Sequence, residues 1–284
     1  MIDSVNKRPP IDKARAANPS AGMSHLLGMG MGMGPGEGAH PYRSPTHIIY
    51  GESLIDRHEW SHTVFLVEFL TNTDWKKKIR VEEPRDDQDE QTLSELKKLR
   101  SKQDHEHRRE RSYEIIAEVH DYVGLYENLC YFDAHTHPIT SSLVQTVDLI
   151  GWTVVQYYKE RFGRTRPSYL DPAIRPVIRV PAHPAYPSGH STQAHLIRNA
   201  LEDVLDFRDD DFRVALSELA QRIAENREWA GVHYESDTLA GKKLALDIWH
   251  LAKSNQNFEK FIAEAKDEWT SSRAFPSRYQ LLDH

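Results

Sequence analysis

The sequence contains a single cysteine, Cys130, so one chain cannot form an internal disulfide, and nothing indicates an oxidising compartment. It has no uninterrupted apolar run of membrane-spanning length, because polar side chains interrupt the best candidate, residues 143–158. Its N-terminus lacks the basic-then-apolar pattern of a signal peptide. Positive charge is also in deficit: the net charge is −7, which argues against a nucleic-acid-binding surface. We expect a soluble, cytoplasmic protein with no nucleic-acid partner and no membrane span.

Strand signals are scarce as well, and the apolar residues recur at helical spacing instead. Stripes at steps of three and four run over residues 194–205, 212–223 and 240–251. An earlier stripe is the most regular, and Thr140 or Ser141 is expected to cap its helix. It consists of Leu143, Val147, Ile150, Val154 and Tyr158. The pattern predicts an all-α fold, a helical bundle.

Composition divides the chain into three parts. Residues 1–40 are rich in methionine and glycine and are predicted to be a disordered tail, because they cannot bury enough apolar surface to offset their ordering entropy. Residues 41–110 are predicted to form a helical extension with an exposed, charged helix over 91–111, where both charge signs are interleaved. Residues 111–284 are predicted to form the main helical domain, which begins with an amphipathic helix over 114–129.

Two histidines, separated by one residue, lie in the stretch from Asp133 to Pro138. Such a step, here His135 and His137, can begin a binuclear metal site in a barrel of parallel strands. Helical periods flank this stretch on both sides, so we interpret it as a polar loop between helices.

The stretch Pro187-Ser188-Gly189-His190 lies where a proline-rich segment, residues 168–187, gives way to a helical pattern from Ser191. The prolines predict that this segment is not helical. A Ser-Gly pair at a helix start offers free N–H groups, a hydroxyl and the positive end of the helix dipole. Gly189 lets the backbone approach an oxyanion, and His190 places a titratable ring beside it. The stretch predicts a phosphate-binding site.

Cations gather where the first apolar stripe ends. Lys159 and Arg166 belong to this group, and Pro167 follows directly. Arg161 and Arg164 lie between them, and we interpret these two as compensation of the helix dipole and as surface charges.

Arg227 continues an apolar stripe, which is unusual because a buried charge needs a partner anion. His233 and Asp237 follow, four residues apart. Together with the earlier stretches, the spacing reads K-x6-RP, then PSGH, then R-x5-H-x3-D. This resembles the three-part signature of the type 2 phosphatidic acid phosphatase superfamily, which contains membrane lipid phosphatases, soluble acid phosphatases and vanadium-dependent haloperoxidases. The resemblance covers Lys159 to Asp237, and Asn226 stands where the family usually has serine.

The resemblance implies a catalytic bundle of the acid phosphatase/vanadium haloperoxidase type over residues 111–284. His233 would be the nucleophile that forms a phosphohistidine, and Asp237, on the same helical face, would hold its imidazole in the right tautomer. His190 would be the general acid and then the base. Three cations and two neutral donors would bind the oxyanion, namely Lys159, Arg166, Arg227, Ser188 and Gly189. Because the cations are side chains, no metal ion is implied.

Phosphate and vanadate fit the same pocket, so two activities stay open. A soluble phosphoric monoester hydrolase would take a small phosphorylated substrate and need no cofactor; residues 231–241 and the chain length favour it. A vanadium-dependent haloperoxidase would bind vanadate on His233 and use peroxide and a halide, and His183 would lie beside the vanadate. A third hypothesis is a non-catalytic helical interaction module that works through residues 91–111 and the N-terminus. Each of the three is compatible with a homo-oligomer.

Overall fold

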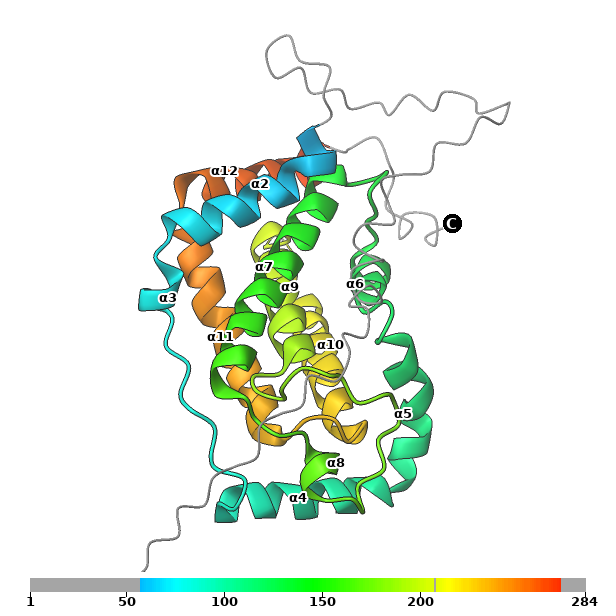
Figure 1. Cartoon of the computed structure of the whole chain (residues 1–284). Coiled ribbons are helices and arrows are strands. Elements are labelled where there is room, and N and C mark those ends of the chain that lie inside the picture. Colours follow the sequence, from blue (N-terminus) through cyan, green and yellow to red (C-terminus); the bar gives the residue numbers. More distant parts are fainter. Residues whose placement is uncertain (1–56, 207, 272–284) are drawn as a thin grey trace, which may run out of the picture. The chain divides into compact units, whose positions relative to one another are not determined.

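The computed structural model describes residues 57–206 and 208–271, and within these ranges it contains helices and connecting loops but no strand (Figure 1). The predicted all-α fold is confirmed. The predicted tail over residues 1–40 lies outside the described residues.

Four helices form the central bundle: α7 (Pro138–Phe162), α9 (Gly189–Val204), α10 (Asp210–Trp229) and α11 (Glu235–Lys253). Helix α9 lies at its centre and contacts the other three (Figure 1). The stripe predicted from Leu143 to Tyr158 is buried along α7, as are Ile197 and Leu201 of α9. Hydrophobic burial on these faces supplies the main driving force for packing the bundle.

One glycine sets how closely α9 and α11 approach. A Cβ atom on Gly241 would lie 2.7 Å from the carbonyl oxygen of Ser188 and 2.8 Å from the Cβ of Ser191. Both distances are below van der Waals contact, so only glycine lets the start of α9 rest on α11.

Two further helices cover one end of the bundle, α2 (Arg57–Asn72) and α12 (Gln256–Ser271), with the short α3 (Trp75–Lys78) following α2. Phe65 of α2 stacks on Phe261 of α12 with ring centroids 4.4 Å apart. Helix α12 also caps α7, because the carboxylate of Glu268 accepts hydrogen bonds from the backbone N–H groups of Ile139 and Thr140. The prediction that Thr140 or Ser141 caps α7 was wrong: the helix begins at Pro138, and a carboxylate distant in sequence satisfies its free N–H groups.

The segment before α7 forms three helices rather than the two predicted: α4 (Glu90–Gln103), α5 (Glu106–Ala117) and α6 (Val123–Cys130). The prediction of a single exposed helix over 91–111 was wrong. The side chain of His105 accepts a hydrogen bond from the N–H of His107, and this cap starts a new helix. Helix α4 also buries four side chains, those of Thr92, Glu95, Leu96 and Leu99.

The amphipathic helix predicted over 114–129 is interrupted in the same way. The backbone turns between α5 and α6, and Asp121 accepts a hydrogen bond from the N–H of Gly124 at the start of α6. Ile116 and Val119, which helical spacing would place on the apolar face of such a helix, are about half exposed. A buried ion pair of Glu118, described below, fixes this turn and overrides the local pattern.

The proline-rich segment is irregular except for the short helix α8 (Pro167–Leu170), so the prediction of no helix there was wrong over one turn. Proline at a first helical position is well tolerated because its missing N–H has no partner there anyway. Residues 133–137 form the expected polar loop. The described part of the chain holds no group of three or more side chains suited to bind a metal ion.

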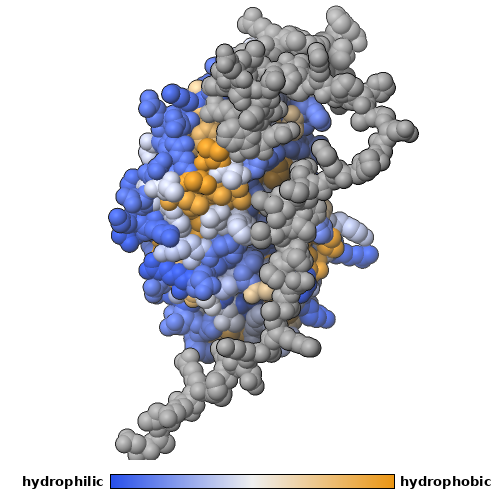
Figure 2. All heavy atoms as spheres, turned by 45° about the horizontal axis from the view of Figure 1, so that its top comes forward, coloured by the Kyte–Doolittle hydropathy of each residue, from blue (hydrophilic) through white to orange (hydrophobic). Residues whose placement is uncertain are grey.

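The face of the molecule in Figure 2 is mostly hydrophilic and carries one conspicuous group of hydrophobic side chains. Trp152 of α7 and Val67 of α2 are among the large apolar side chains that are about half exposed. None of the described helices combines the length and the apolar character needed to cross a membrane.

Candidate active site

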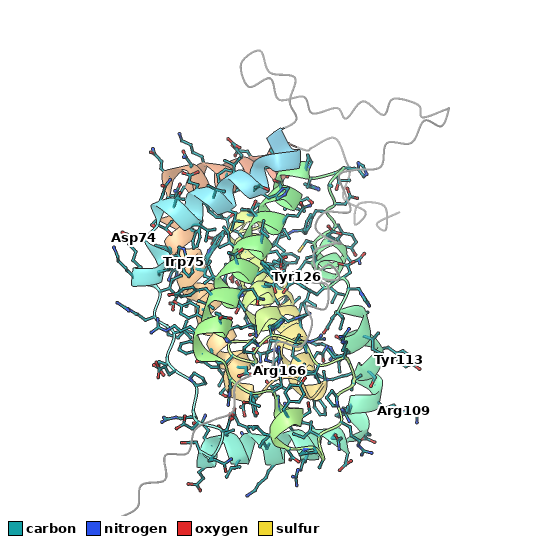
Figure 3. All side chains as sticks on the ribbon, in the orientation of Figure 1. Asp74, Trp75, Arg109, Tyr113, Tyr126 and Arg166 are labelled. Atoms are coloured by element: carbon teal, nitrogen blue, oxygen red, sulfur yellow. The ribbon has the colours of Figure 1, made fainter. Side chains whose placement is uncertain are left out.

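The residues of the three motifs meet at one end of the central bundle. The last turn of α7 supplies Lys159, and the start of α8 supplies Arg166, which is labelled in Figure 3. The start of α9 supplies His190, and the connection from α10 to α11 supplies His233. Three junctions between helices and loops thus place backbone and side-chain donors in one buried region.

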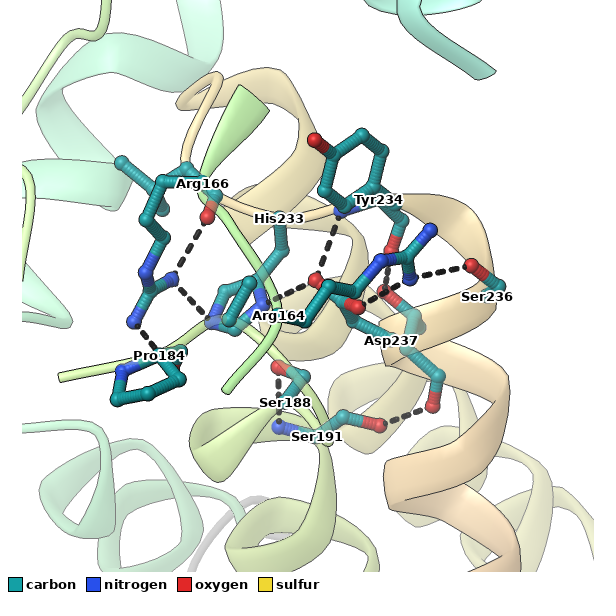
Figure 4. Close-up of polar contacts among 12 residues, drawn as sticks. Arg164, Arg166, Pro184, Ser188, Ser191, His233, Tyr234, Ser236 and Asp237 are labelled. Carbon is teal, nitrogen blue, oxygen red and sulfur yellow. Dashed lines mark hydrogen bonds and ion pairs between the residues drawn. The ribbon is translucent and has the colours of Figure 1, made fainter. Parts of the chain in front are cut away.

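His233 and Asp237 are in direct contact. His233 Nδ1 donates to Asp237 Oδ2 over 2.8 Å, and the N–H of Tyr234 donates to the same oxygen over 3.1 Å (Figure 4). The two residues do not share a helical face as predicted, because Gly231, with φ of 76°, turns the chain after α10 and His233 precedes α11. The predicted contact is present nevertheless, and it leaves His233 Nε2 without a proton.

Both members of this pair are buried, which perturbs their pKa values in a coupled way. Burial raises the pKa of Asp237, but the hydrogen bond from His233 and the charge of Arg164 outweigh it, so that the pKa falls to about 2. Burial, followed by the charge of Arg166, lowers the pKa of His233 well below its usual range. The resting pair is therefore a carboxylate and a neutral imidazole.

Arg166 is buried against the nucleophile candidate. Its Nη1 donates to the carbonyl of Val232 over 2.7 Å and to His233 Nε2 over 3.0 Å. Its Nε and Nη2 donate to the carbonyls of His183 and Pro184. Burial lowers the pKa of Arg166 to about 10, so it is a cation at neutral pH.

Lys159 holds the same loop, because its Nζ donates to the carbonyls of Pro184 and Ala185 over 2.8 and 2.9 Å. Burial, followed by the charge of Arg166, lowers the pKa of Lys159 well below its usual range. Two of the three predicted oxyanion ligands therefore also organise residues 183–185.

Arg227 has two donors that none of the described residues satisfies. Its Nη2 donates to the carbonyl of Ile115 over 3.2 Å and pairs with Glu118 in a buried ion pair. Its Nε and Nη1 are buried and have no hydrogen-bond partner among the described residues. Since buried donors are almost always satisfied, this side of the guanidinium fits an anionic ligand.

Asn226, the departure from the family pattern, has a defined role. Its Nδ2 donates to Glu118 Oε1 over 2.7 Å, and its Oδ1 accepts from Arg111 Nη1 over 2.9 Å. Burial raises the pKa of Glu118 to about 7, although Arg227 and Asn226 both act in the opposite direction.

The start of α9 is built around Ser188, whose hydroxyl caps the helix by accepting from the N–H of Ser191 over 3.4 Å. The helix begins at Gly189, two residues earlier than predicted, and a Cβ at Gly189 would meet nothing closer than 3.6 Å. Room for a side chain exists there, so glycine is not required by crowding within the described fold.

His190 has its Nε2 3.2 Å from the carbonyl of Glu118. Because a carbonyl only accepts, Nε2 carries the proton. Burial, followed by the charge of Arg227, lowers the pKa of His190 to about 3. His183 lies at the exposed rim with Nδ1 3.1 Å from Arg166 Nη2, and partial burial with the charges of Lys159 and Arg166 lowers its pKa to about 4.

Sequence reasoning missed three charged residues that hold the site. Arg164 was interpreted as a surface charge, which was wrong: it is buried between Asp237 and Glu95. Glu95 and Glu118 belong to segments outside the motifs. The sequence did indicate that Arg227 requires an anionic partner, but it did not indicate that this partner is Glu118, because several acidic residues could have filled that role.

No family model matches the sequence, and no curated protein matches it either. Solved structures do. A bacterial vanadium-dependent iodoperoxidase matches with 17% identity and a TM-score of 0.50, over 64% of this chain and 52% of the peroxidase, so the match spans about half of that protein. A transmembrane PAP2-type phosphatidylglycerolphosphate phosphatase from Bacillus subtilis matches with 17% identity over 69% of this chain and 95% of that one. The TM-score of that match is 0.46.

At this level of identity the likeness to the iodoperoxidase establishes the fold alone. It confirms the predicted class, an all-α bundle of the phosphatase/haloperoxidase type, and agrees with the resemblance drawn from the motifs.

Proposed function

We propose that the protein is a phosphoric monoester hydrolase that forms a phosphohistidine on His233. The observation that carries this proposal is the orientation of His233, whose Nδ1 is engaged by Asp237 while Nε2 lies beside the guanidinium of Arg166. The unpartnered donors of Arg227 support it, because they fit an oxyanion in the same buried region.

In the first step, the lone pair on His233 Nε2 attacks phosphorus, and the bond from phosphorus to the leaving oxygen breaks. The leaving oxygen takes a proton from His190, whose pKa a bound phosphate dianion would raise from about 3. In the second step, His190 removes a proton from water, the water oxygen attacks phosphorus, and the P–N bond returns its electron pair to Nε2.

Arg166 has a specific part in this sequence. All of its donors are occupied, and Nη1 occupies the very lone pair that must attack. When phosphate oxygens replace His233 Nε2 as acceptors, Arg166 both stabilises the transferring group and frees the nucleophile. Lys159 and Arg227 add positive charge on the other oxygens.

The second candidate function is a vanadium-dependent haloperoxidase, favoured by the contact of His183 with Arg166 at the rim of the site. The residues fit vanadate: His233 Nε2 would be its ligand, and Lys159, Arg166 and Arg227 would balance its charge. Bound vanadate would supply peroxide activation, and His190 would hold or release the proton.

Paired assays on one purified sample test these alternatives: hydrolysis of p-nitrophenyl phosphate from pH 4 to 8 with and without orthovanadate, and bromination of a phenol dye with peroxide, bromide and vanadate. We expect hydrolysis that vanadate inhibits, its abolition in His233→Ala, and a loss of about 10²–10⁴-fold in His190→Ala. Bromination that requires vanadate, with feeble hydrolysis, would make the haloperoxidase correct. Full activity of His233→Ala would refute both.

A further inference from the structure

Asp237 is bound on both sides. Its Oδ2 accepts from His233, while its Oδ1 accepts from Arg164 Nη1 over 2.5 Å (Figure 4). The guanidinium of Arg164 lies 4.0 Å from the ring centre of Tyr234 and is almost completely buried. Arg164 therefore has no freedom to leave the carboxylate, and it fixes the plane in which Oδ2 faces the imidazole.

A second carboxylate, from α4, holds Arg164 in turn. Glu95 Oε2 accepts from Arg164 Nη2 over 3.1 Å and from the hydroxyl of Ser236 over 2.8 Å. Glu95 Oε1 accepts from the N–H of Ser236 over 2.6 Å, at the start of α11. The side chain is 6% exposed, so its charge is placed in the interior rather than in water.

The charge of this cluster changes during the proposed reaction. At rest, the two carboxylates of Glu95 and Asp237 face the guanidinium of Arg164 and a neutral imidazole, and a second guanidinium, that of Arg166, contacts the other nitrogen of the ring. Transfer of phosphoryl to His233 Nε2 makes the ring an imidazolium, so a new positive charge appears beside Asp237. A buried charge is costly when unpaired, so the two carboxylates around Arg164 stabilise the positive ring better than Asp237 alone would.

We propose that Glu95 is a positioning residue for catalysis, acting through Arg164 and Asp237 to orient His233 and to compensate the charge that it gains. This inference rests on the proposed phosphohistidine chemistry. It makes α4, which lies outside the three motifs, a necessary part of the active site.

A purely structural role is the alternative, because Glu95 also caps α11. The variant Glu95→Gln separates the two, since the amide oxygen can still accept from the N–H of Ser236 while the charge is lost. Ser236→Ala is the complementary variant, which removes the hydroxyl contacts and keeps every charge. Glu90→Gln, the same change at an exposed position of α4, is the matched control.

The measurements are kcat and KM for p-nitrophenyl phosphate, the inhibition constant of sulfate, and thermal unfolding. We expect Glu95→Gln to lower kcat by about 10- to 100-fold, the range typical of losing an outer hydrogen-bonding partner that orients a functional group. Sulfate inhibition should change less than about twofold, because the oxyanion ligands are intact; Ser236→Ala and Glu90→Gln should keep kcat within about threefold.

Wild-type kcat in Glu95→Gln would overturn the inference, as would equal losses in Glu95→Gln and Ser236→Ala. If Glu95→Gln does not fold, Arg164→Lys decides, because lysine keeps the charge but cannot bridge both carboxylates; an unchanged kcat then refutes the inference. His233→Ala is measured in the same series. Its retained activity would refute the proposed function, whereas an inactive His233→Ala beside an active Glu95→Gln refutes this inference alone.

Discussion

Replacing Glu118 by glutamine tests how the site controls anion binding. Glu118 shares Arg227 with the oxyanion, since it pairs with Nη2 while Nε and Nη1 are unpartnered in the described structure. A charged Glu118 both neutralises Arg227 and repels an incoming dianion. Because burial raises the pKa of Glu118 to about 7, its charge develops in the neutral range, and anion affinity should fall as pH rises.

The size of the effect follows from that pKa. If the anion binds only when Glu118 is protonated, affinity falls with the protonated fraction, which is about one half at pH 7 and about one thirtieth at pH 8.5. The dissociation constant should therefore rise roughly 15-fold over this interval. In Glu118→Gln the neutral side chain removes this dependence.

Sulfate is the suitable probe because it remains a dianion throughout, and its inhibition constant is measured from pH 6 to 8.5 in both proteins. Lys159, whose pKa burial also lowers, is unchanged in Glu118→Gln, so any pH dependence that it contributes is retained in the variant. Circular dichroism checks that the variant is folded. A sulfate constant that rises equally steeply in both proteins would refute the reasoning.

Two further predictions concern stability. Gly241→Ala should lower the free energy of unfolding by about 1–3 kcal/mol, because its Cβ would lie 2.7 Å from the carbonyl oxygen of Ser188. Urea denaturation measures this free energy, and the control Leu246→Ala, at a half-exposed position, should lower it far less. Burial lowers the pKa of His195 to about 4, so the unfolded chain takes up this proton first on acidification, and the neutral ring's contribution is lost as pH falls from about 6.5 to 4. His195→Gln should therefore reduce the stability difference between pH 7 and pH 4 by about 3 kcal/mol, and an unchanged difference in urea melts would contradict this assignment.

The long helices could be predicted because their apolar stripes are local. The positions from Leu143 to Tyr158 recur at helical spacing, and in a chain with few strand signals such faces are buried by packing helix on helix. The segments around α5 could not be predicted in this way. Their charged residues give only a weak stripe, and Glu118 is fixed by a contact with Arg227 that is 109 residues away in sequence.

For the candidate site, too, local features could be predicted from the sequence and contacts between distant residues could not. Sequence by itself determined the fold class and the residues with unusual chemistry, because a PSGH turn and an arginine within an apolar stripe are recognisable from neighbours in the chain. Only the tertiary structure decided how these residues are paired. Arg164 resembles any other cation at a helix end until packing buries it between Glu95 and Asp237, and the choice of partner for a buried charge depends on which carboxylates the fold brings within reach.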